Sequence, residues 1–157
     1  MKVLIIEDGF EYSETLQRFL HDGFEWRRAG SGPQALTALK AEAAEAIYLD
    51  MRFDRAPPHE LYGDVVAVAD QFNGDTAQAR QFIEDHQGTY ILAELRAQGV
   101  DLPVLLSFDF ASEPRRWESL VRRYGPMDFV PDSAGPGDVA ARLRALAVNA
   151  RGGGASR

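Results

Sequence analysis

The chain has 157 residues, of which 45% are hydrophobic, and it carries a net charge of −7 and no cysteine. These values favour one domain with its own core and exclude disulfides and thiolate chemistry. The acidic charge argues against nucleic acid and anionic membrane as partners. The short apolar start predicts neither a signal peptide nor a membrane span, so a cytoplasmic protein is expected.

The first fifty residues alternate between apolar runs and amphipathic segments. Strands are expected at 3–6 and 46–50, where apolar residues form short runs, and a weaker strand is expected at 23–30, between two glycines. Between the first two strands, the helical spacing of Leu16, Phe19 and Leu20 predicts a helix, with Ser13 as its N-cap. A second helix is expected over 32–43, before the third strand.

The same alternation returns in the last third of the chain. Strands are expected at 102–108 and 127–130, and helices at 88–99, 113–125 and 137–148. Gly99 stands where a helix ends in the left-handed conformation. This pattern predicts a doubly wound α/β domain with a parallel sheet over residues 1–149. Residues 150–157 are expected to form a flexible tail.

The segment 53–87 has no place in this alternation and is predicted to be an insertion. Its first part has the composition of a loop, and a short helix is expected over 64–72. Asp75 is expected to cap a further helix, which could continue through Gly88 into the next one. The apolar residues of the insertion are expected to pack on the domain, because leaving them in water is costly. They are Val65, Val66, Phe72, Phe82 and Ile83.

Acidic residues follow the predicted strands. Glu7 and Asp8 follow the first strand, Asp50 ends the third, and further aspartates come after the last two. Because ligands of an open parallel sheet bind at the carboxyl ends of its strands, Glu7, Asp8 and Asp50 are expected to converge there. Three carboxylates suit Mg²⁺, which prefers oxygen ligands. The alternative is that these acids cap the following helices or face water.

The order of these motifs resembles the receiver domain of bacterial two-component response regulators. "VLIIEDG" resembles the first strand with its acidic pair, and "AIYLDM" resembles the strand of the phospho-acceptor. "LPVLLSF" and "YGPMDFVPD" resemble the fourth and fifth strands. The resemblance covers nearly all of the chain except about 53–87. It implies a flavodoxin-like five-stranded parallel sheet with strand order 2-1-3-4-5.

The resemblance also implies roles for individual residues. Asp50 would be the phospho-acceptor and would hold Mg²⁺ together with Glu7 and Asp8. Ser107 and Phe129 would be the hydroxyl and aromatic switch residues. The chain would be a stand-alone signalling protein and not an enzyme, with a histidine kinase or another signalling protein as its partner. It would be a monomer, or a homodimer through the face of the last two helices.

The sequence departs from the family at the lysine that follows the fifth strand. Counting from Phe129, that position is Asp132, and a shift of one residue places Val130 there instead. No lysine follows Lys40, so no alignment restores it. Two carboxylates about 4–5 Å apart repel by roughly 3–4 kcal/mol at an effective dielectric near 20. Arg52 is either a substitute cation or a solvated loop arginine.

Phe108 is a second departure, because the family usually has a small residue after the hydroxyl, where the phosphoryl group needs room. Three functions therefore stay open. The first is a pseudo-receiver that acts through protein contacts without an ordinary phospho-switch. The second is a phospho-switch at Asp50 that uses Arg52, and the third is a small Mg²⁺-dependent hydrolase.

The predicted helix at 113–125 is rich in arginine although the chain is acidic. Its arginines are Arg115, Arg116, Arg122 and Arg123. They form either a solvated face or a docking surface for an acidic partner.

Overall fold

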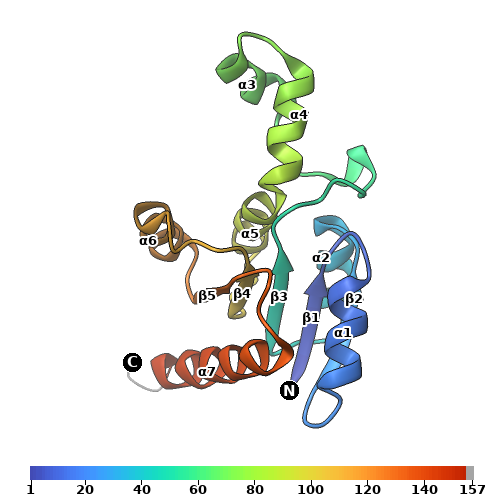
Figure 1. The fold of residues 1–157 in the computed structure, drawn as a ribbon, viewed down its shortest axis with the longest axis vertical. Coiled ribbons are helices and arrows are strands. Elements are labelled where there is room, and N and C mark those ends of the chain that lie inside the picture. Colours follow the sequence, from blue (N-terminus) through green and yellow to red (C-terminus); the bar gives the residue numbers. More distant parts are fainter. Residues whose placement is uncertain (155–157) are drawn as a thin grey trace.

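A computed structural model describes residues 1–154 and shows a parallel sheet with helices on both faces (Figure 1). The strands are β1 (Lys2–Ile6), β2 (Glu25–Ala29), β3 (Ala46–Asp50), β4 (Val104–Ser107) and β5 (Met127–Val130). All neighbouring strands pair in parallel, in the order β2-β1-β3-β4-β5. The predicted fold class and strand order are confirmed.

Seven α-helices occur within residues 1–154. They are α1 (Glu11–Phe19), α2 (Gly32–Ala41), α3 (Val65–Ala69), α4 (Thr76–Asp85), α5 (Gln87–Ala97), α6 (Pro114–Tyr124) and α7 (Pro136–Gly154). Two 3₁₀ turns, η1 (Pro58–Glu60) and η2 (Asp70–Phe72), lie in the predicted insertion. Over the same residues, none of the helices combines the length and the apolar character that crossing a membrane requires.

Helix α7 is longer than expected. Residues 150–154, predicted to belong to a flexible tail, continue the helix. Near its end, Arg151 forms an ion pair with Glu45 at 3.4 Å, which ties this part of the helix to the start of β3. Residues 155–157 of the predicted tail lie outside the described residues.

Side chains alternate along the strands and fill a core on each face of the sheet. Leu4 and Ile6 of β1 pack toward α2, α5 and α6, whereas Val3 and Ile5 pack toward α1 and α7. Because such strands are buried on both faces of the sheet, they form continuous apolar runs in the amino-acid sequence. Each fully buried aliphatic side chain contributes about 1.5–3 kcal/mol. This packing brings the carboxyl ends of β1, β3 and β4 to one edge.

The start of α1 differs from the prediction. Ser13 is not an N-cap, because it lies buried in the helix and its hydroxyl donates to the Phe10 carbonyl at 3.1 Å. The carboxylate of Glu7 instead accepts from the backbone N–H groups of Tyr12 and Ser13, at 3.2 and 2.7 Å. A carboxylate at the end of β1 thus satisfies free donors of the next helix. Phe19, predicted to lie on the apolar face, is 62% exposed.

The insertion forms a helical arm, defined here as residues 64–86, which projects beyond the sheet (Figure 1). The arm has a small core made by Val68, Ala69, Ala79 and Ile83. As predicted, Asp75 caps α4 and accepts from the backbone N–H groups of residues 77 and 78. His86 alone separates α4 from α5, so the helix is interrupted there. Val66, expected to be packed, is 73% exposed.

The base of the arm is fastened to the segment that follows β3. The Phe53 N–H donates to the Glu84 carbonyl, and the Gly88 N–H donates to the Met51 carbonyl, both at 2.9 Å. A Cβ atom on Gly88 would lie only 2.6 Å from the Asp50 carbonyl oxygen. The arm is therefore joined directly to the residues next to Asp50.

Candidate functional site

A cavity of about 460 Å³ opens at the carboxyl edge of the sheet. Its walls are formed by Tyr12, Asp50, Met51, Arg52, Asp85, Ser107, Phe108, Asp109 and Asp132. Asp50 and Ser107 are register partners at the ends of β3 and β4. The structure thus brings together six residues that the sequence singled out: Asp50, Arg52, Ser107, Phe108, Asp109 and Asp132.

Asp50 is half-buried at the floor of this cavity. Its Oδ1 accepts from the Met51 N–H at 2.8 Å. Burial raises the pKa of Asp50 to about 7, and the negative charges of Asp8 and Glu7 act in the same direction. The hydrogen bond from Met51 opposes this shift. A carboxyl group with such a pKa exchanges a proton near neutral pH, which is unusual for aspartate.

The other two predicted metal ligands already have protein partners. Glu7 is 1% exposed and caps α1, and burial raises its pKa against the opposing effect of the bonds from Ser13 and Tyr12. Asp8 accepts from the Arg55 N–H at 2.7 Å and lies 3.5 Å from the Arg55 guanidinium.

Arg55 therefore supplies the cation beside the acidic pair, a role that no local sequence signal assigned to it. Its guanidinium also bonds Glu11 at 2.7 Å, and this bond lowers the pKa of Glu11 to about 2.

This donor arrangement does not fit a three-carboxylate Mg²⁺ centre. The oxygens of Glu7 and Asp8 point at N–H donors rather than at a shared point with Asp50. Among residues 1–154, no group of three acidic or histidine side chains has the spacing that a metal ion needs. Binding of Mg²⁺ by Glu7, Asp8 and Asp50 stays a prediction, and it would require Arg55 to move.

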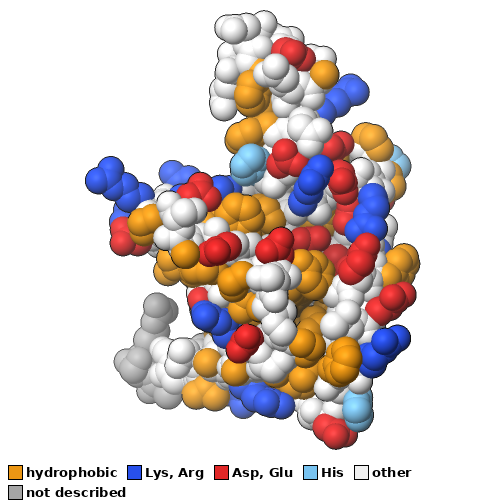
Figure 2. Space-filling model, viewed as in Figure 1, with side chains coloured by type: hydrophobic (Ala, Val, Ile, Leu, Met, Phe, Trp, Pro, Cys, Tyr) orange, Lys and Arg blue, Asp and Glu red, His pale blue; other side chains and the backbone are white. Residues whose placement is uncertain are grey.

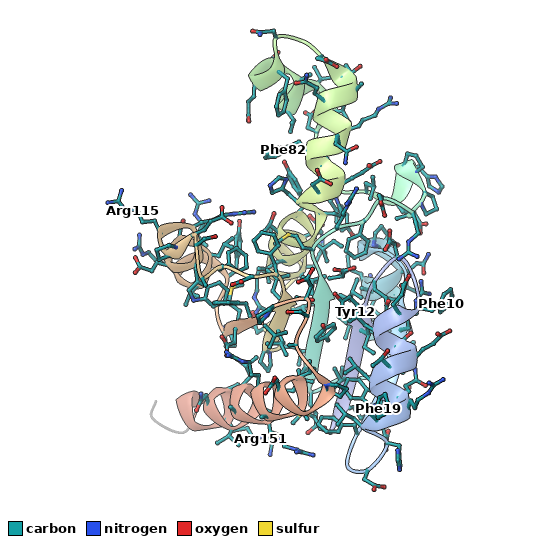
Figure 3. The ribbon with its side chains drawn as sticks, in the orientation of Figure 1. Phe10, Tyr12, Phe19, Phe82, Arg115 and Arg151 are labelled. Carbon is teal, nitrogen blue, oxygen red and sulfur yellow. The ribbon has the colours of Figure 1, made fainter. Side chains whose placement is uncertain are left out.

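Ser107 is almost fully buried and bonds to a tyrosine that the sequence gave no reason to select. Its hydroxyl donates to the Tyr12 hydroxyl oxygen at 3.1 Å. The Tyr12 ring, which α1 extends toward β3, lies 5.2 Å from the ring of Tyr48 (Figure 3). Burial raises the pKa of Tyr12, and the charges of Asp50 and Asp132 raise it further. Tyr12 thus bonds the hydroxyl position and lines the same cavity as both aspartates.

Phe129 belongs to a cluster of aromatic rings between β5 and α6. Its ring centroid lies 4.8 Å from that of Trp117 and 5.5 Å from that of Phe110. Phe110, which is 1% exposed, also contacts Phe108 at the cavity wall, at 4.7 Å. The aromatic position named from the sequence is thus connected to the cavity through packed rings.

Arg52 lies at the cavity, but its charge is already engaged. The guanidinium forms ion pairs with Asp85 of α4 at 3.3 Å and with Asp54 at 3.5 Å. Asp85 is a further cavity acid that the sequence did not single out, whereas Asp109 is one of the aspartates that follow the last two predicted strands. Asp132, at the predicted lysine position, is exposed and faces the same space. Acids therefore outnumber the single arginine in the cavity wall.

The structure is similar to solved receiver domains at low sequence identity. With the Francisella response regulator 1452 receiver domain, the TM-score is 0.64 at 17% identity, covering 95% of this chain and 98% of that chain. With the receiver domain of a signal transduction histidine kinase from Syntrophus aciditrophicus, the TM-score is 0.62 at 17% identity, covering 94% and 90%. A response regulator receiver domain protein from Clostridium thermocellum gives 0.63 at 13%, covering 96% of both.

No protein-family model matches the sequence, and no curated protein matches it. The structural similarities show that the chain has the fold of a response-regulator receiver domain. At these identities they show the fold alone.

Proposed function

We propose that the chain is an atypical receiver that signals through protein contacts and does not operate as an ordinary phospho-switch. The observation that supports this proposal is the charge of the cavity. Asp50 stands at the acceptor position, yet Asp132 occupies the expected lysine position and both lysines of the chain precede residue 41. A phosphoryl group on Asp50 would add negative charge beside three other aspartates.

Phe108 supports the same proposal. It lines the cavity and packs on Phe110, while the Arg116 guanidinium lies 5.5 Å from both ring centroids. A bulky ring, held in place by this packing, therefore stands where the family usually has a small residue. The partner class is a protein, such as a histidine kinase or another signalling protein.

One observation favours a second candidate, a phospho-switch that uses Arg52. Its guanidinium lines the same cavity as Asp50. Arg52 would need only a local rearrangement to release Asp85 and bind a phosphoryl group on Asp50. The third reading, a small Mg²⁺-dependent hydrolase, depends on the metal site that the donor arrangement of Glu7 and Asp8 does not fit.

Phosphotransfer from acetyl phosphate, followed by intact mass, tests the proposal. The wild type is expected to show little or no added phosphoryl group, and Asp132→Lys is expected to increase the phosphorylated fraction. Asp50→Asn is the control for attachment at Asp50. A stable adduct on the wild type that is lost in both Asp50→Asn and Arg52→Gln would favour the Arg52 phospho-switch instead.

A further inference from the structure

Two surfaces of opposite charge lie outside the cavity. Outside the cavity wall, the arm contains four acids and one arginine: Asp64, Asp70, Asp75, Glu84 and Arg80. Helix α6 contains four arginines and one acid: Arg115, Arg116, Arg122, Arg123 and Glu118. Basic side chains gather over α6 at the left edge of the molecule, and the arm rises at the top (Figure 2). Such segregation is unexpected in a chain whose net charge is −7.

The arginines of α6 are mostly free to meet a partner. Trp117 and Leu120 pack this helix on the core. Arg116 pairs with Glu113 at 3.4 Å, whereas Arg115 points away from the body (Figure 3). Over the described part of the chain, no ion pair forms at Arg115, Arg122 or Arg123. Val121, 38% exposed, lies beside these charges.

The arm presents a surface of matching character. Asp64 and Asp75 cap α3 and α4 through Oδ1, which leaves their other carboxylate oxygen for a partner. Asp70 is exposed, and Val66 lies one helical turn before it with 73% of its surface exposed. Val66, exposed among the acids of the arm, therefore complements Val121, exposed among the arginines of α6.

We propose that two copies of the chain associate around a two-fold axis, with the arm of each copy on α6 of the other. Both elements project from the body of the domain (Figure 1), so one rotation can form both contacts. A stable interface buries about 1,200–2,000 Å² in total, and a single short helical contact supplies little of this. Two-fold symmetry repeats the contact between the arm and α6, and so doubles the buried area. This dimer differs from the expected one through the face of the last two helices, and it does not depend on phosphorylation.

Complementary charge makes this association sensitive to salt. Electrostatic attraction sets the specificity and the rate of such contacts, and the Debye length falls from about 10 Å at 0.1 M salt to about 3 Å at 1 M. The dimer is therefore expected to weaken as salt is added, whereas a dimer held by apolar contacts alone would not.

Paired charge reversals test the contact in the full chain, with sedimentation velocity at low salt as the measurement. Arg122→Glu with Arg123→Glu makes α6 acidic, and Asp70→Lys with Gln71→Lys adds three positive charges to the arm and places two lysines near Val66. Each double variant alone sets like charges against each other, so its dimer should dissociate at least about tenfold more readily than that of the wild type. Circular dichroism confirms folding.

Mixing the two double variants provides the decisive step. In the mixed pair, the acidic arm of the first variant meets the arginines of the second, and the two new lysines on the arm of the second meet the new glutamates of the first. The heterodimer should therefore form with about the affinity of the wild type. Glu14→Lys with Gln17→Lys on α1, exposed positions with the same charge change as the arm variant, is the matched control and should leave the dimer intact.

Three results would overturn the proposal. The first is a wild type that stays monomeric at low salt and high concentration. The second is a dimer that neither reversal weakens. The third is a mixture of two folded double variants that fails to associate.

Discussion

At the scale of single residues, Asp50 is a carboxyl group in surroundings that disfavour its charge. Its pKa lies at about 7 because it is half-buried and because Asp8 and Glu7 are also negative. An ordinary aspartate has a pKa of about 3.9. At any pH between about 3.9 and about 7, the folded chain keeps a proton on Asp50 that the unfolded chain has released. This single group therefore lowers stability as pH rises through that window.

Replacing Asp50 with asparagine removes this titration. Asparagine stays neutral, so the free energy of unfolding of Asp50→Asn should exceed that of the wild type more at pH 8 than at pH 5. The difference between the two pH values should be on the order of 1–3 kcal/mol, because each pKa unit corresponds to about 1.4 kcal/mol. Urea unfolding in the presence of a chelator measures it. Asp22→Asn, at an exposed position outside the proposed dimer contact, is the control.

If Asp50→Asn changes the free energy of unfolding by the same amount at pH 5 and at pH 8, the pKa of Asp50 is not raised. Glu7 also has a raised pKa, but burial is the largest cause of that shift and is the same in both proteins.

Arg55 controls the access of a cation to the acidic pair. Its backbone and guanidinium occupy both oxygens of Asp8, so a divalent ion in the wild type must displace it. Arg55→Gln should free the guanidinium side of Asp8 and raise the affinity for Mn²⁺ by about tenfold, since a nearby positive charge is removed. Calorimetry measures this affinity, with Arg18→Gln on α1 as the control. If Arg55→Gln binds Mn²⁺ no better than the wild type, these carboxylates do not form a metal site.

At the scale of elements, burial explains which predictions succeeded. Strands such as Ala46–Asp50 are buried on both faces, so their apolar runs could be recognised without knowledge of their neighbours. The start of α1 could not be predicted in the same way. Its cap comes from Glu7, which follows β1, and not from Ser13 within the helix, and only the three-dimensional arrangement shows this.

Gly88 marks the closest approach between α5 and the segment after β3. In a helix, alanine is ordinarily more stable than glycine by about 1 kcal/mol. Here a Cβ atom would lie 2.6 Å from the Asp50 carbonyl oxygen and 2.9 Å from the Met51 Cα, both of which belong to the backbone. Gly88→Ala should therefore destabilise the protein by about 1–3 kcal/mol, as overpacking does.

Gly137→Ala is the matched control for this substitution. Gly137 also lies in a helix, but a Cβ atom there meets nothing within 4 Å. This variant should be neutral or slightly stabilising, because only the helix preference changes. Thermal unfolding compares the two. A Gly88→Ala variant as stable as Gly137→Ala would show that α5 is not held against β3 as described.

At the scale of the whole molecule, the cavity combines residues that could be found from the sequence with residues that could not. Asp50 and Ser107 end neighbouring strands, so strand order alone placed them together. Tyr12 comes from a helix and Asp85 from the arm. Neither stands in a motif, and the arm has no counterpart in the family pattern, so only the folded chain reveals them.

The last prediction concerns coupling between Asp50 and the distal aromatic cluster. A bound group shifts an equilibrium only by interacting differently with its two states. In this cavity the acid at Asp132 opposes an added negative charge, and Arg52 is held by Asp85 and Asp54. A beryllofluoride mimic should therefore change the rotamer of Phe129 little. Trp117, whose ring lies 4.8 Å from Phe129, reports this change through its fluorescence.

The comparison should include wild type, Asp50→Asn and Asp132→Lys, each with and without the mimic. Trp26→Phe in all three leaves Trp117 as the only tryptophan. Wild type and Asp50→Asn should give the same small response, whereas Asp132→Lys should respond more strongly, because lysine attracts the mimic. Partner affinity measured on the same set gives the functional reading. A change of about tenfold seen in the wild type but not in Asp50→Asn, equivalent to about 1.4 kcal/mol of coupling, would reject the atypical receiver and favour the Arg52 phospho-switch.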